Sequence, residues 1–267
     1  MSGINSNVQL LTLLVDPSDE DDSDYRFLVD GKEVKYVTVA PGTLPKDDRT
    51  FAPVLIPMLP TFPKGDWNQG HVSKDPATGE LSFTSYEKVD LDGIEYTWHP
   101  TRIDFLELTK LGRLRQNVQR VSHPLFDTPV IFKFAEFPWQ IPYFETETTA
   151  YEWIEGQDIG PKFLGHVTEA GRVMGWIIED LGEARTAEPA DLTVCQEVLG
   201  RLHGLGIKHG DINRFNFLVR EEKAHLVDFE AATKCSDVGE LEAEFERLEE
   251  SLKDPSFRGG VGPATVG

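Results

Sequence analysis

The chain has 267 residues, of which 39% are hydrophobic and 10% aromatic, so it can form a folded core and global disorder is excluded. Its 26 basic and 46 acidic residues give a formal net charge of −20, which disfavours nucleic acid. The charge would favour a cationic ligand or a basic protein surface, although surplus acidic residues more often serve solubility alone. The two cysteines lack the spacing of a zinc site. No segment suits a membrane span or a secretory signal, so we expect a cytoplasmic protein without a membrane partner.

Residues 1–103 are expected to form a β-rich N-terminal extension. Extended runs are predicted at 8–15, at 25–39 around Asp30-Gly31, and at 87–98 around Asp92-Gly93. Asp-Gly between extended runs is a strong hairpin signal. The acidic stretch 16–24 lacks the glycine and terminal glutamate of a calcium-binding EF-hand loop, so a solvated loop is the better interpretation.

The remaining residues are expected to mix strands and helices, which predicts an α+β fold. Division into the parts 104–179 and 180–255 is predicted, followed by a flexible tail at 256–267. Strands are predicted at 129–134, 172–178, 217–220 and 224–227, and helices at 145–154, 192–205 and 240–252.

One loop and the strand after it carry the most informative pattern. His209, Asp211 and Asn216 have the spacing His-x-Asp-x-x-x-x-Asn, and Asp228-Phe229 follows at short range. A lone Asp or Asn in a loop usually stabilises a turn, but the joint spacing argues against coincidence. The pattern resembles the catalytic core of the protein-kinase-like superfamily. The resemblance implies ATP and magnesium as cofactors, with Asp211 orienting an acceptor hydroxyl and Asn216 and Asp228 binding the metal ion.

Two upstream residues fit the same resemblance. Val130-Ile-Phe-Lys133 resembles the strand whose lysine contacts the α- and β-phosphates, although a strand lysine alone would suggest a solvated edge. The segment 147–154 resembles the next helix of aminoglycoside and choline kinases, which makes Glu147 the expected partner of Lys133 and Glu145 the alternative. Helical periodicity does not decide which glutamate faces inward.

The residues expected to contact the nucleotide are less distinctive. Trp176-Ile-Ile-Glu-Asp-Leu181 resembles the strand and linker that bind adenine, with Glu179 and Leu181 supplying the carbonyl and amide, although an ordinary buried strand would look the same. Gly112 is the single glycine in 111–118, where protein kinases have three. Arg113 and Arg115 could contact phosphate instead.

Taken together, the resemblance predicts a two-lobed protein-kinase-like fold with a truncated C-terminal lobe. Residue 230 is Glu where protein kinases have Gly, as in choline-type kinases, and no Ala-Pro-Glu sequence follows. The short ending resembles the small atypical kinase of the tRNA-modification complex, and the acidic composition resembles fungal kinase-like proteins.

The predicted function is ATP-dependent phosphate transfer, with Asp211, Lys133 and Asn216 catalytic and an unidentified small-molecule or protein hydroxyl as acceptor. A small cationic metabolite is the first choice. The alternatives are a nucleotide-binding pseudokinase and a partner-activated atypical protein kinase that serves as an interaction module.

Overall fold

The computed structural model describes residues 4–256, so residues 257–267 of the predicted flexible tail lie outside it. The chain divides into two compact units, residues 1–92 and 93–267, which are described separately. Several sheets and four α-helices confirm the predicted α+β class. Within residues 4–256 no helix is long and apolar enough to cross a membrane.

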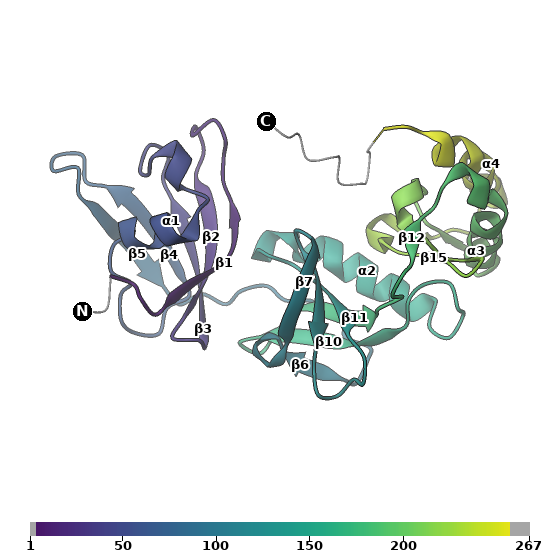
Figure 1. Cartoon of the computed structure of the whole chain (residues 1–267), viewed down its shortest axis with the longest axis horizontal. Coiled ribbons are helices and arrows are strands. Elements are labelled where there is room, and N and C mark those ends of the chain that lie inside the picture. The colour runs from purple at the N-terminus through teal and green to yellow at the C-terminus, as the bar shows by residue number, and fades with distance from the viewer. Residues whose placement is uncertain (1–3, 257–267) are drawn as a thin grey trace. The chain divides into compact units, whose positions relative to one another are not determined.

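The first unit contains a five-stranded sheet in the order β1-β2-β3-β4-β5 and one short helix (Figure 1). The strands are β1 (Val8–Leu14), β2 (Ser23–Val29), β3 (Glu33–Val39), β4 (Gln69–Lys74) and β5 (Leu81–Glu87), and the helix is α1 (Ala52–Met58). The predicted strand at 8–15 and the hairpin at 25–39 are confirmed, since β2 and β3 pair in antiparallel fashion around Asp30-Gly31. The side chains of Tyr25, Phe27, Leu55 and Trp67 form part of this unit's core.

The predicted hairpin at 87–98 is wrong. Residues 88–101 contain no strand, and Ile94 instead donates a backbone hydrogen bond of 2.9 Å to the carbonyl of Val173. A Cβ atom on Gly93 would lie 3.1 Å from that carbonyl oxygen and 3.0 Å from the Cβ of Arg172. Glycine is therefore needed here because two segments pack closely together. An Asp-Gly pair in a tight turn looks the same in the sequence, which explains the wrong prediction.

The second unit contains a six-stranded sheet in the order β6-β10-β11-β9-β8-β7, with helix α2 beside it (Figure 1). These elements are β6 (Arg102–Asp104), β7 (Thr109–Arg115), β8 (Val118–Ser122), β9 (Val130–Phe134), α2 (Ile141–Trp153), β10 (Phe163–Glu169) and β11 (Arg172–Glu179). The strands predicted at 129–134 and 172–178 are confirmed. Helix α2 begins before the predicted start at residue 145, because Pro142 is compatible with the first helical turn.

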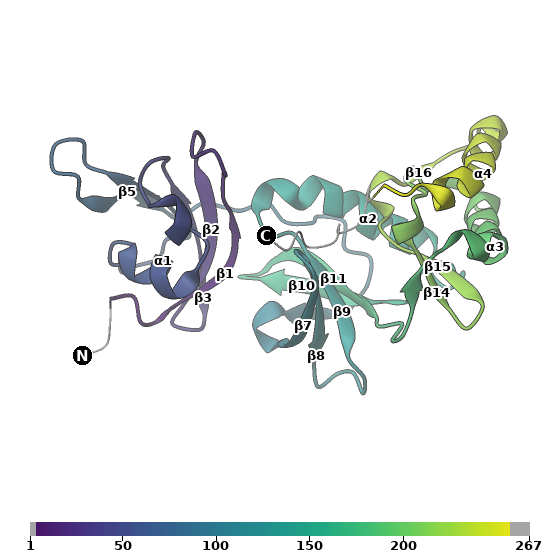
Figure 2. The same ribbon diagram turned by 45° about the horizontal axis from the view of Figure 1, so that its top comes forward.

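The second unit continues with two small sheets and two helices. The elements are β12 (Arg185–Thr186), α3 (Leu192–Gly204), β13 (Ile207–Lys208), β14 (Phe217–Arg220), β15 (Lys223–Leu226), β16 (Thr233–Lys234) and α4 (Val238–Lys253). Helices α3 and α4 pack side by side (Figure 2). The two predicted helices and the strands at 217–220 and 224–227 are confirmed, and Leu248 and Leu252 form the buried face of α4.

One of the hydrophobic clusters of this unit connects the large sheet with the segments after it. The Tyr151 ring of α2 meets the Phe229 ring edge-on, with centroids 5.3 Å apart, and Phe229 directly follows Asp228. Apolar packing therefore fixes Asp228 relative to α2.

The close antiparallel pairing of β9 with β11 leaves no room for a side chain at Gly175. A Cβ atom there would lie 2.2 Å from the carbonyl oxygen of Lys133. We predict that Gly175→Ala lowers the free energy of unfolding by at least about 2 kcal/mol, because backbone must move. Gly204→Ala is the matched control, since nothing lies within 4 Å of its Cβ position. Urea unfolding of the full chain measures both, and equal stabilities of the two variants would contradict the prediction.

Candidate functional site

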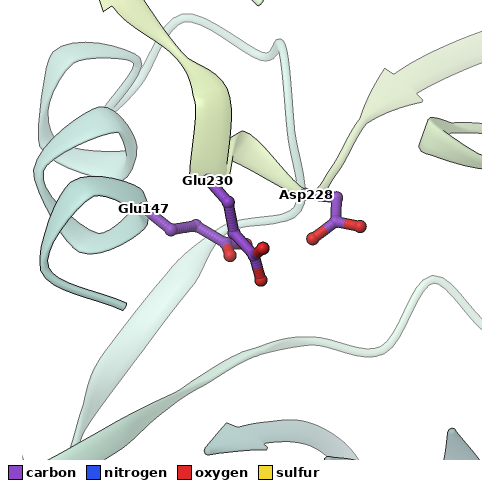
Figure 3. A group of neighbouring side chains, drawn as sticks. All are labelled: Glu147, Asp228 and Glu230. Carbon is purple, nitrogen blue, oxygen red and sulfur yellow. The ribbon is translucent and has the colours of Figure 1, made fainter. Parts of the chain in front are cut away.

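Lys133 lies at the centre of a cluster of carboxylates. Its side chain is 11% exposed, and its Nζ donates hydrogen bonds to Glu147 at 2.5 Å, Asp228 at 2.6 Å and Glu230 at 3.2 Å. Figure 3 shows Glu147 projecting from α2 toward Glu230, with Asp228 beside them. Strand β9, helix α2 and the segment after β15 thus contribute to one site.

Glu147 is the glutamate that faces inward. Its side chain is 1% exposed, whereas the carboxylate of Glu145 accepts hydrogen bonds from the backbone amides of Glu95 and Tyr96 at the surface. Two residues differ by about 200° around a helix axis, so only one of the two can approach Lys133.

The cluster has more negative than positive groups. Burial by itself would lower the pKa of Lys133, but the three carboxylates outweigh it and raise the pKa above its usual value. Burial raises the pKa of Glu147, and Lys133 offsets only part of this. For Asp228 burial is outweighed by Lys133, which keeps the pKa below its usual range. Oxygen atoms of the three carboxylates lie within 4.8 Å of one another, so the site suits a further cation.

The loop that contains Asp211 is ordered by two amide side chains. Asn213 Nδ2 donates to Asp211 Oδ2 at 2.9 Å, and Asn216 Nδ2 donates to the backbone oxygen of Asp211 at 2.9 Å. The Oδ1 atom of Asn216 is buried and has no hydrogen-bond partner within residues 4–256. A buried amide oxygen without a partner is costly, and magnesium prefers oxygen ligands, so Asn216 and Asp228 fit the predicted metal site.

His209 connects this loop to the segment before Asp228. Its Nδ1 accepts from the backbone amide of Asp211 at 3.3 Å, and its Nε2 lies 3.1 Å from the carbonyl oxygen of Val227. Burial lowers the pKa of His209, which favours the neutral ring. Because Nδ1 is an acceptor, the proton belongs on Nε2, which donates to Val227. His209 therefore has a structural role.

Glu244 holds the loop that contains Asp211 in position, a role that was not predicted from the sequence. This residue of α4 is buried, and its carboxylate accepts from the backbone amides of His209 at 3.0 Å and Gly210 at 2.8 Å. It also lies 2.8 Å from His203 Nε2. A sequence signal existed, since Glu244 precedes the core residue Leu248 by one helical turn and so shares its face.

A cavity of about 680 Å³ opens beside Lys133 and is large enough for a nucleotide. Its walls include Ile131 and Ile178 together with the predicted residues Glu179 and Leu181. Of the predicted nucleotide contacts within residues 4–256, Gly112 and Arg113 do not line the cavity. Arg115, the other arginine predicted to contact phosphate, does line the wall, with Nη1 3.9 Å from Asp228 Oδ2.

No protein-family model matches the chain. A probable bifunctional tRNA threonylcarbamoyladenosine biosynthesis protein of Methanoculleus marisnigri is 36% identical over 70 residues, which are 25% of this chain and 13% of that protein. The KEOPS complex subunit Bud32 of Pyrococcus abyssi is 29% identical over 118 residues, or 41% of this chain and 44% of that protein. The chain thus spans less than half of either relative. These matches support distant homology to the atypical kinases of tRNA modification, while the likeness to aminoglycoside and choline kinases stays a prediction.

The buried hydrogen bonds of Glu244 predict a pH-dependent contribution to stability. Burial alone would raise its pKa, but the hydrogen bonds from His203 and the two amides hold the pKa below the usual 4.5. Its contribution is therefore complete above pH 4.5 and is lost as the pH falls through the lower folded value. We expect Glu244→Gln to lower the unfolding free energy by about 2 kcal/mol at pH 7 and by less at pH 4. Denaturant titrations at both pH values test this, with the exposed Glu242→Gln as control, and a loss that grows toward acid pH would contradict it.

Proposed function

We propose that this chain is an ATP- and magnesium-dependent phosphotransferase with a two-lobed kinase-like fold, in which residues 104–179 and 180–255 form the lobes. The observation that carries the proposal is the convergence of Lys133, Glu147 and Asp228 on one cavity, with Asp211 and Asn216 in the adjoining loop. The resemblance to the kinase-like motifs predicted these residues, with Glu145 as the alternative to Glu147. Distant similarity to atypical kinases supports the same interpretation.

In this proposal Lys133 exchanges two of its carboxylate partners for phosphate oxygens. Glu147 is the partner that it keeps, because Glu147 is fully buried whereas Asp228 and Glu230 are partly exposed. Asp228 and Asn216 Oδ1 would hold magnesium, which neutralises phosphate charge. Ile131 and Ile178 would pack against adenine, and the backbone of Glu179 and Leu181 would bind its edge.

Asp211 would orient the acceptor hydroxyl. Its Oδ2 accepts from Asn213 and Asn216, at 2.9 and 3.2 Å, which fixes the carboxylate in one orientation. As the hydroxyl oxygen bonds to the γ-phosphorus, the bond from that phosphorus to the bridging oxygen breaks, ADP leaves, and the hydroxyl proton passes to Asp211.

A second candidate is a nucleotide-binding module that works with a partner. It is favoured by the name of one relative, a subunit of the KEOPS complex, and by the arginine-rich segment 111–118 in place of a glycine-rich loop. This candidate predicts ATP binding without turnover, or turnover only with a copurifying protein.

ATP binding tests the proposal directly. Calorimetry should detect magnesium-dependent binding that weakens at least about tenfold in Lys133→Ala and in Asp228→Asn, because each variant removes a charged contact. Lys110→Ala and Asp127→Asn change exposed residues of the same kinds outside the cavity and should bind normally. Binding that is unchanged in all four variants would sink the assignment.

Asp211 should affect chemistry and not nucleotide affinity. We expect Asp211→Asn to lower the rate of phosphate transfer, or of ATP hydrolysis where no acceptor is supplied, by about 10²- to 10⁴-fold with an unchanged Kd for ATP. Single-turnover kinetics alongside calorimetry measure both quantities. A variant with the wild-type rate would refute the role of Asp211.

A further inference from the structure

A second hollow adjoins Asp211 on the side formed by α4. Its volume is about 560 Å³, within the range of small-molecule sites. One wall is the loop 210–215, and the other is the end of α4 with residues 254–256. The hydroxyl of Ser251 donates to the carbonyl oxygen of Ile212 at 3.0 Å, which fixes the two walls to each other. Because Asp211 lines this hollow, a molecule bound here would place a hydroxyl near it.

Two arginines in these walls have no acidic partner. Arg214 comes from the loop and Arg247 from α4, and neither forms an ion pair within residues 4–256. The guanidinium carbon of Arg214 lies 4.7 Å from the Phe215 ring centroid, and its Nε is buried without a hydrogen-bond partner in the described chain. Arg247 uses only its Nε, which donates to the carbonyl oxygen of Ala243 at 3.1 Å.

Within the described chain, the hollow contains three charged residues besides Asp211 and the two arginines, namely Glu250, Lys253 and Asp254. Lys253 pairs with Glu249 one turn away on α4, so its charge is already matched. Glu250 and Asp254 add negative charge at the α4 wall, so an anion would have to bind on the side of the arginines. The two arginines are thus the basic groups available to a ligand, and guanidinium groups bind carboxylate and phosphate through paired hydrogen bonds.

We propose that this hollow binds the acceptor, and that the acceptor is a small alcohol carrying a carboxylate or phosphate held by Arg214 and Arg247. The inference rests on the proposed phosphotransferase function and names its substrate class. It replaces the cationic acceptor expected from the net charge of −20, because that charge belongs to the whole surface, whereas two arginines without ion pairs in the described chain line the hollow with Asp211. The same net charge disfavours a polyanion such as RNA and so favours a small molecule.

Acceptor binding can be measured without ATP, which separates this inference from the proposed function. The full chain is titrated by calorimetry with glycerol 3-phosphate, glycerate, glycerol and choline. We expect binding of at least one of the two anions, no detectable binding of glycerol or choline, and weakening of at least about tenfold in Arg214→Ala and in Arg247→Ala. Lysine at either position should restore part of the affinity. Arg102→Ala, which changes an exposed arginine of β6, is the control.

The other possible results either overturn the inference or separate it from the proposed function. Tighter binding of choline than of either anion, anion binding that survives Arg214→Ala combined with Arg247→Ala, or no binding of either anion at millimolar concentration would overturn the inference. Loss of ATP binding in both arginine variants would show that they act on folding or on the nucleotide site, and would also overturn it. An anion bound through both arginines by a chain that does not bind ATP would uphold the hollow and refute the phosphotransferase.

Discussion

The second unit depends on one buried ammonium group shared by three carboxylates. Lys133 bonds to Glu147, Asp228 and Glu230, and Arg115 lies 3.9 Å from Asp228, so two basic groups share three carboxylates. Such an arrangement is poor for stability, because burying unmatched charge is costly. It becomes favourable when a cation and an anionic ligand bind together, as magnesium and the phosphates of ATP would. We infer that the site is held ready for ligands at some expense of stability.

Packing and hydrogen bonds hold the parts of this site in position from several sides. Gly175 lets β11 approach β9 closely at Lys133, and Tyr151 packs against Phe229 beside Asp228. Below the loop, Glu244 binds the backbone of His209, whose ring contacts the carbonyl oxygen of Val227. A continuous set of contacts therefore runs from α4 through the loop to Asp228, and the same helix forms one wall of the proposed acceptor hollow.

The sequence predicted local structure well where short-range rules apply. The hairpin at Asp30-Gly31 followed from turn chemistry, and the strand of Lys133 followed from its apolar run. The same Asp-Gly rule failed at Asp92-Gly93, because tertiary contact with β11 and not a turn requires that glycine. The choice between Glu145 and Glu147 depends on which face of α2 meets β9, and the unpaired state of Arg214 depends on how its loop packs, so neither is encoded locally. Helical spacing indicates that Glu244 shares the buried face of α4, but its contact with the loop depends on tertiary packing. The roles assigned to the site residues, the boundaries of the lobes and the cytoplasmic location remain predictions.

The central claim is that Lys133 and its carboxylates form a nucleotide and metal site. A crystal structure of the full chain with magnesium and a non-hydrolysable ATP analogue tests it most directly. We predict that Lys133 keeps Glu147 and contacts the phosphates, and that the metal is bound by Asp228 and by Oδ1 of Asn216. A nucleotide bound elsewhere, or Lys133 still paired with Asp228 and Glu230 at saturating analogue, would contradict the claim.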